Sequence, residues 1–131
     1  LPALLLLEII PTKISVVGYA VGLILSVLGL LLMVWTRCCR QVDWGFMGDD
    51  SGGTLFVEGP YRLTRHPYYI GALLVEIGLY LQLNYWFVIL MFPVLLFIMQ
   101  VIKKEEVFLM QRFGQQYLEY KQKVGVFPWF R

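Results

Sequence analysis

The sequence has few charged residues, one histidine and two cysteines, and each of these shortages excludes a class of protein. Charged residues make up 15% of the 131 residues and hydrophobic residues 59%, whereas ordinary soluble domains are about 25% charged. Composition therefore predicts an integral membrane protein. The formal net charge of +2 is too small to indicate nucleic acid as a partner. Adjacent Cys38 and Cys39 cannot form an ordinary disulfide or a four-ligand metal site alone, so we expect reduced thiols and no metal.

The chain also lacks a phosphate-binding glycine loop. The glycines of residues 43–53 lie among aspartates without the spacing of a dinucleotide fingerprint, and no strand pattern precedes them. We interpret this segment as a flexible linker, with a short extended piece at residues 54–57. The length of the chain likewise excludes a Rossmann-type cofactor domain.

One long apolar run is present. Residues 14–35 carry no charged side chain, and at about 1.5 Å per residue they reach about 33 Å, enough to cross a hydrocarbon core of about 30 Å. Arg37 and Arg40 follow this run, and Lys103 and Lys104 follow the next long apolar region. Because positive charges favour the cytoplasmic side, both ends and residues 37–68 are predicted to be cytoplasmic.

Residues 69–102 predict a helical hairpin that turns at the polar residues of segment 82–85. Its first arm, residues 69–81, would be only about 20 Å long, and Pro93 should kink the second arm. The helix is expected to continue beyond the membrane through residues 105–113 and to stop at Gly114. A final amphipathic helix is predicted over residues 115–124.

The predicted fold is therefore all-α and polytopic, with one spanning helix, a kinked hairpin and C-terminal cytoplasmic helices. We divide the chain into an N-terminal membrane part (residues 1–40), a cytoplasmic linker (residues 41–58) and a core (residues 59–131). The sequence begins within an apolar run and without methionine. We therefore expect a truncated or processed piece, with a further transmembrane segment upstream.

The most specialised stretch is residues 59–71, which contains the only histidine, His66, among arginines, tyrosines, prolines and glycines. Pro67 biases His66 toward an extended conformation and can start a helix, whose free N–H groups suit an anionic group. Histidine is also the side chain that changes charge near neutral pH. Arg62 and Arg65 can equally be membrane-flanking charges, so both interpretations stay open.

Acidic and aromatic residues further along the chain form a second candidate group. Glu105 and Glu106 follow the hairpin on the same predicted side as His66, where they can take up a proton or attract a cation, or simply offset nearby lysines. Tyr117 and Tyr120 share a helix face and can wall an aromatic site or only pack. Glu76 lies within the first hairpin arm, where a charge is costly and usually faces a cavity or partner.

These residues carry a resemblance. Four motifs follow one another along the chain: Gly-Pro-Tyr-Arg at residues 59–62, Arg-His-Pro-x-Tyr-x-Gly at 65–71, the glutamate pair, and Phe-Gly-x-x-Tyr-x-x-Tyr at 113–120. Val124 and Pro128 come after the last of them. The pattern resembles the C-terminal half of the isoprenylcysteine carboxyl methyltransferase family, whose relatives include membrane phospholipid N-methyltransferases. The match covers about residues 57–128.

The resemblance implies a membrane methyltransferase that holds S-adenosylmethionine in a helical pocket facing the cytoplasm. It implies catalytic roles for Arg65, Glu105 and Glu106, and cofactor contacts from Gly59, Tyr61, His66, Pro67, Tyr69, Gly71, Glu106, Tyr117 and Tyr120. The acceptor is expected to be a membrane lipid or a lipidated molecule, with Glu76 as a candidate substrate contact. That family has an arginine one turn before the first glutamate, where this chain has Val101.

Several alternatives therefore stay open. An amine acceptor, as in phospholipid N-methylation, must lose a proton, for which a glutamate or His66 can serve, whereas a carboxylate or small thiolate acceptor needs no base. A different class of function is a small proton-coupled transport protein with a relay of Glu76, His66 and Glu105. A non-catalytic subunit with a methyltransferase-like shell is a third. The sequence leaves the acceptor and the oligomeric state open.

Overall fold

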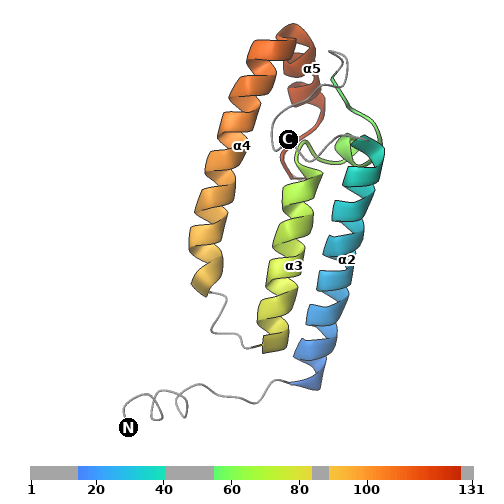
Figure 1. Ribbon diagram of the computed structural model, residues 1–131, viewed down its shortest axis with the longest axis vertical. Coiled ribbons are helices and arrows are strands. Elements are labelled where there is room, and N and C mark those ends of the chain that lie inside the picture. The colour runs from blue at the N-terminus through green and yellow to red at the C-terminus, as the bar shows by residue number, and fades with distance from the viewer. Residues whose placement is uncertain (1–14, 41–54, 84–88, 128–131) are drawn as a thin grey trace.

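Helices make up every regular element in the computed structural model, which describes residues 15–40, 55–83 and 89–127. The elements are α2 (Val16–Arg40), the 3-10 turn η1 (Gly59–Arg62), α3 (Pro67–Leu83), α4 (Met91–Phe113) and α5 (Gln115–Lys123). Figure 1 shows α2, α3 and α4 running along the long axis of the molecule, with η1 and α5 together at one end. The all-helical prediction is thus confirmed for the described residues.

The long apolar run forms α2. Within the described residues, Val16–Cys39 is the one helix of sufficient length and apolar character to cross a membrane, and α3 is a shorter apolar helix. Large apolar side chains on α2 are exposed, among them Leu31 at 60% and Val34 at 57%. A surface of this kind suits lipid, since bilayer chains are as apolar as the side chains.

Helices α2 and α3 pack closely because small residues face one another. A Cβ atom placed on Gly71 would lie 2.8 Å from the carbonyl oxygen of Gly29, and one placed on Gly78 would lie 2.7 Å from the backbone nitrogen of Ser26. Glycines at such positions let two helix backbones approach, as is common in membranes. Gln82 adds a 3.0 Å hydrogen bond from its Nε2 to the Ser26 hydroxyl oxygen.

Two details of the predicted hairpin are wrong. Pro93 is the third residue of α4, where the first N–H groups of a helix have no intrahelical partner, so proline fits without kinking the helix. Gln82 and Leu83 continue α3 and do not begin the turn, because Gln82 finds polar partners in Ser26 and the Gly78 carbonyl. Asn84 and Tyr85 lie outside the described residues, as does the predicted linker of residues 43–53.

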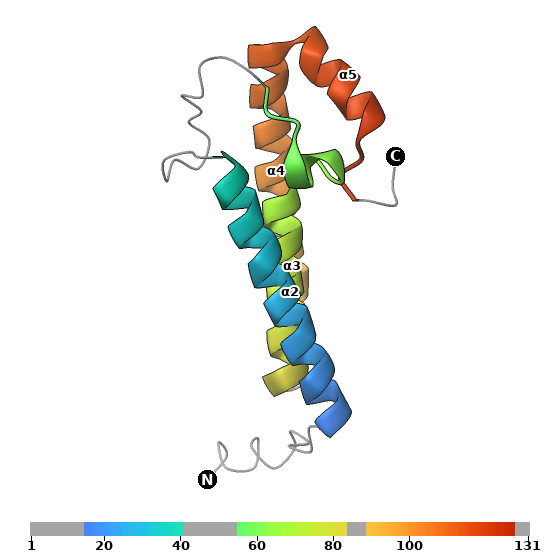
Figure 2. The same cartoon turned by 90° about the vertical axis from the view of Figure 1, so that its right-hand side faces the viewer.

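The C-terminal end of the fold follows the prediction. Helix α4 continues past the lysine pair and ends at Gly114, which has φ +51° and whose N–H donates to the carbonyl of Met110 at 2.9 Å. Positive φ is readily adopted by glycine. Helix α5 then turns back toward η1, as Figure 2 shows from a second direction, and its C-cap Val124 lies at the residue where we predicted its end.

Candidate functional site

His66 lies immediately before α3 and is buried, with 3% of its surface exposed. Pro67 begins α3, consistent with its fixed φ and missing N–H. The backbone around His66 is tied to the C-terminal segment that follows α5: the Arg65 N–H donates to the Gly125 carbonyl at 3.0 Å, and the Thr64 hydroxyl donates to the Val126 carbonyl. The carbonyl groups of Gly125 and Val126 therefore fix the segment that presents His66.

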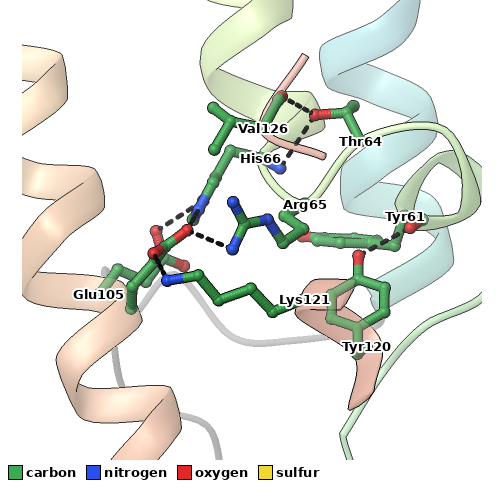
Figure 3. Close-up of polar contacts among 9 residues, drawn as sticks. Tyr61, Thr64, Arg65, His66, Glu105, Tyr120, Lys121 and Val126 are labelled. Atoms are coloured by element: carbon green, nitrogen blue, oxygen red, sulfur yellow. Dashed lines mark hydrogen bonds and ion pairs between the residues drawn. The ribbon is translucent and has the colours of Figure 1, made fainter. Parts of the chain in front are cut away.

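The imidazole of His66 lies between the two adjacent carboxylates of α4. Its Nε2 is 3.3 Å from Glu106 Oε1, and its Nδ1 is 3.5 Å from Glu105 Oε2. Forty sequence positions separate His66 from Glu106, so only the folded chain brings them together. Figure 3 shows His66 and Arg65 both directed toward the Glu105 side of α4, with Lys121 approaching from α5.

Glu106 is the centre of this charged group. Its Oε1 is 2.8 Å from Nη1 of Arg65, and its Oε2 accepts a 2.9 Å hydrogen bond from Nζ of Lys121. Three cationic groups from two parts of the chain, the segment before α3 and helix α5, therefore converge on one carboxylate when His66 is protonated. Its side chain is 17% exposed, so solvent screens these contacts less than it would on an open surface.

Several buried polar atoms at the site have no hydrogen-bond partner within the described chain. They are Nε and Nη1 of Arg65, Oε2 of Glu105 and the hydroxyl of Tyr117. The close approach of Arg65 Nη1 to Glu106 is thus an ion pair whose N–H does not point at the oxygen, and the contact of Glu105 with His66 is likewise electrostatic. Since buried polar groups are nearly always satisfied, this set suits a polar ligand.

The electrostatic surroundings shift the pKa values of the cluster. Burial lowers the pKa of His66, but the contacts and charges of Glu105 and Glu106 outweigh it, and the pKa is raised above 6.5. The His66 contact, against the opposing effect of burial and with help from Lys121 and Arg65, lowers the pKa of Glu106 to about 2. His66 is thus favoured in its charged form, and Glu106 is ionised at neutral pH.

Aromatic residues form the wall behind the charges. Tyr61, Tyr117 and Tyr120 make a buried cluster, in which the Tyr120 hydroxyl donates to the Tyr61 carbonyl at 2.7 Å. Tyr117 is 1% exposed, and burial raises the pKa of its phenol to about 12. The predicted shared face of Tyr117 and Tyr120 is therefore real, and it packs α5 onto η1.

The remaining predicted site residues divide into near and distant groups. The Tyr69 ring lies 6.0 Å from the His66 ring, and Gly59 begins η1 with φ +58° and faces Cys39. Gly71, by contrast, faces α2 and packs against Gly29. Glu76 lies further along α3, where Tyr80 donates a 2.5 Å hydrogen bond to it, and it is not part of the cluster.

Sequence reasoning missed two features of the site. Thr64 was not selected, although it is buried with 3% exposed and bonds to the backbone of Val126. The pairing of Lys121 with Glu106 was also missed, although Lys121 lies on the same helix face as Tyr117. A threonine three residues before a helix-starting proline was a usable signal, because its hydroxyl can bond to nearby backbone. Its partner, the carbonyl of Val126, lies 62 positions away and could not be identified from the sequence.

The arrangement combines fixed positive and negative groups with an aromatic wall. It can bind a molecule that carries both charges, and it can exchange a proton through His66 or a carboxylate. Metal chemistry has no candidate here: across residues 15–40, 55–83 and 89–127 no group of three His, Cys, Asp or Glu side chains is placed to hold a metal ion.

Comparison with known proteins places the chain among membrane methyltransferases. The family model described as phospholipid methyltransferase matches residues 17–116. A protein-S-isoprenylcysteine O-methyltransferase of Saccharomyces cerevisiae is 33% identical over 113 residues, which are 77% of this chain and 47% of that protein. Its human counterpart is 32% identical over 112 residues, 76% of this chain and 39% of that protein. The Arabidopsis thaliana protein A of this name is 43% identical over 73 residues, 54% of this chain and 37% of that protein.

The chain thus spans less than half the length of these curated relatives. No solved structure matches it. The family match nevertheless covers most of the chain, from α2 through the start of α5, and includes Arg65, His66 and both glutamates of the cluster. The chain belongs to the phospholipid methyltransferase family and is distantly similar to protein-S-isoprenylcysteine O-methyltransferases.

Proposed function

We propose that this chain is the catalytic part of an integral membrane methyltransferase that uses S-adenosylmethionine and methylates a lipophilic acceptor. The observation that carries the proposal is the convergence of Arg65 and His66 with Glu105 and Glu106 at the end of an apolar helix bundle. Four buried polar atoms at this site, belonging to Arg65, Glu105 and Tyr117, lack a hydrogen-bond partner within the described residues. Charge, burial and unused hydrogen-bonding capacity together are what a polar cofactor requires.

The residues present fit the chemical groups of this cofactor. Arg65 and His66 can hold its carboxylate, since charge-assisted bonds to a carboxylate are strong. Glu105 can hold its ammonium group, and the buried hydroxyl of Tyr117 can meet a further polar atom. Tyr61 and Tyr69 offer aromatic surface for the adenine ring. Gly59 and Pro67 shape the backbone around the pocket, whereas the contact of Gly71 with α2 favours a packing role.

When bound, S-adenosylmethionine supplies a methyl group on a positively charged sulfur, which is already activated for transfer. The chain then has to align the acceptor, exclude water and hold the surrounding charges in place. Tyr117 and His66, each at most 3% exposed, exclude water from this end. The ionised Glu106 carboxylate, held by Arg65 and Lys121, supplies a fixed negative charge. A proton released by an amine acceptor can pass to Glu105 or, when neutral, His66.

For the acceptor we propose an isoprenylcysteine carboxylate, on the strength of the named relatives. The alternatives are the amine of a phospholipid, which the family description favours, and a small thiol. Val101, one turn before Glu105 on α4, offers no positive charge for an acceptor carboxylate, and this observation supports the amine. A lipophilic acceptor would enter from the bilayer beside the apolar helices, while the polar cofactor enters from the cytoplasm.

The test is calorimetric binding of S-adenosylhomocysteine to the full chain in lipid nanodiscs. We expect saturable binding that is lost in His66→Ala and Glu106→Gln. Glu119→Gln is the matched control, because Glu119 is an exposed acid on α5 outside the cluster, and it should bind as the unaltered chain does. Absence of binding by folded unaltered chain would contradict the cofactor assignment, and equal loss in Glu119→Gln would show that the variants report a general charge effect.

A second step identifies the acceptor. Radiolabelled methyl transfer is measured with a farnesylated cysteine, a phosphatidylethanolamine and a small thiol, each presented to the chain in nanodiscs. Transfer to the prenylated carboxylate alone would support the first acceptor class, and transfer to the phospholipid amine alone would replace it with the second. Cofactor binding without transfer to any acceptor would favour a non-catalytic subunit.

A further inference from the structure

Thr64 lies between His66 and the C-terminal segment, residues 124–127. Its side chain is buried, with 3% of the residue exposed. The hydroxyl donates to the Val126 carbonyl and accepts the backbone N–H of His66 at 3.3 Å. A threonine hydroxyl can donate one bond and accept others, so one side chain joins the two parts of the molecule.

The backbone N–H of His66 depends on this hydroxyl. His66 precedes Pro67, the first residue of α3, so its N–H lies outside the hydrogen-bond ladder of that helix. Thr64 Oγ1 is the acceptor the structure gives it. A buried N–H left without an acceptor costs about 1–3 kcal/mol, and the local backbone is expected to shift if the hydroxyl is removed.

The side chain of His66 is sensitive to such a shift. Its two nitrogen atoms lie 3.5 Å and 3.3 Å from the carboxylates of Glu105 and Glu106, at the long end of hydrogen-bonding distances. A displacement of a few tenths of an ångström therefore loses one contact or the other. The other groups that bear on the imidazole are Arg65 beside it and the Tyr69 ring at 6.0 Å, with Lys121 and Tyr117 of α5 acting through Glu106.

We propose that Thr64 is a positioning residue that couples the C-terminal segment to His66 and keeps the imidazole between the two carboxylates of α4. It acts through the His66 backbone and does not itself touch the reacting groups. The placement of His66 follows from the contacts alone, whereas the consequence for cofactor affinity rests on the proposed function.

The single histidine of the chain makes the test direct. With selectively labelled histidine and a purification tag that lacks histidine, one imidazole signal reports His66 in a nuclear magnetic resonance titration. The variants are Thr64→Val and Thr64→Ala, which remove the hydroxyl with and without an added methyl group, and Thr64→Ser, which keeps it. Thr36→Val is the matched control, because Thr36 is equally buried and its hydroxyl bonds within α2.

We expect the His66 pKa, raised above 6.5 in the unaltered chain, to fall toward that value in Thr64→Val and Thr64→Ala. Thr64→Ser should restore it, and Thr36→Val should leave it unchanged. The affinity for S-adenosylhomocysteine should weaken by about fivefold or more in the two variants without the hydroxyl, as expected for loss of a buried hydrogen bond.

An unchanged His66 titration in Thr64→Val and Thr64→Ala would overturn the proposal. So would a Thr64→Ser variant as altered as Thr64→Val, because the methyl group and not the hydroxyl would then matter. Unfolding of both hydroxyl-free variants while Thr64→Ser folds would also overturn it, since the hydroxyl would then be needed for the fold as a whole. The titration requires no cofactor, so it remains decisive if the full chain does not bind S-adenosylhomocysteine.

Discussion

Replacing Glu106 with glutamine tests whether the charged cluster stabilises the fold as well as the site. The substitution keeps the size of the side chain and removes the carboxylate that lies 2.8 Å from Arg65, 3.3 Å from His66 and 2.9 Å from Lys121. The surroundings lower the pKa of this carboxyl from 4.5 to about 2. At about 1.4 kcal/mol for each pH unit, this corresponds to roughly 3 kcal/mol of stabilisation when the carboxylate is ionised.

Glutamine keeps one acceptor oxygen, so we expect Glu106→Gln to lower the free energy of unfolding by about 1–3 kcal/mol near pH 6. This range is large compared with the effect of most surface substitutions, which lie within about 0.5 kcal/mol. The side chain is 17% exposed, and therefore the median value for exposed ion pairs, about 0–1 kcal/mol, is too low for it.

The stabilisation by the cluster should depend on pH, and the two shifted pKa values determine where it is gained and lost. The pKa of Glu106 is lowered, so its contribution is complete above 4.5 and is lost as the pH falls toward 2. The pKa of His66 is raised, so its contribution is complete below 6.5 and is lost as the pH rises through the higher folded value. The cluster therefore stabilises the protein most between these two ordinary values, 4.5 and 6.5.

The assay is thermal unfolding of the chain in detergent at constant ionic strength, across acidic, intermediate and alkaline pH. The difference in melting temperature between the unaltered chain and Glu106→Gln should be largest in the intermediate window and should shrink on both sides. Glu119→Gln, an exposed change on α5, should show no such maximum. A difference that is constant across pH, or absent between 4.5 and 6.5, would refute the electrostatic reasoning.

Two further substitutions separate packing from binding. Gly71→Val should lower the melting temperature in detergent, at a cost of about 1–3 kcal/mol or more. The reason is that a Cβ added at this position would lie 2.7 Å from Met33 Cγ and 2.8 Å from the Gly29 carbonyl oxygen. An unchanged melting temperature with lost cofactor affinity would instead favour ligand contact. Tyr120→Phe removes the 2.7 Å bond to the Tyr61 carbonyl and should cost about 1 kcal/mol in the same assay. Equal stability of Tyr120→Phe and the unaltered chain would show that the bond contributes nothing measurable.

The helices were predictable wherever local signals agreed. The charge-free run predicted α2 because a long apolar segment has few other stable forms, and the ordered helix extends it to Arg40. Gly114 predicted the boundary between α4 and α5 because its positive φ is readily adopted by glycine. Pro93 misled the prediction because a proline within an apolar run looks the same whether the helix starts beside it or passes through it. The division of the chain into three parts stays a prediction.

The members of the charged cluster could be selected from the sequence, but their geometry could not, and their roles at a functional site stay predictions. Arg65, His66 and the two glutamates stood out as unusual residues at the ends of apolar segments, and the fold brings them together. The sequence does not encode distances between segments in any local pattern. Gly71 shows the limit: from the sequence, a glycine beside such a motif is equally suited to a ligand or to a neighbouring helix. Its contact with α2 was visible only in the structure, and its predicted cofactor contact stays a prediction.

Glu106 of α4 and Glu76 of α3 differ in their surroundings, and this difference bears on the proposed proton relay. Glu106 is surrounded by cations, whereas Glu76 receives a hydrogen bond from Tyr80. A proton relay would have to join Glu76 to His66, ten residues and about 15 Å away along α3. Residues 70–75 of this helix carry no titratable or hydroxyl side chain, and the intervening Gly71 is packed against α2. Helix α3 itself therefore offers no continuous path for a proton between Glu76 and His66, and it gives no support to a relay of Glu76, His66 and Glu105.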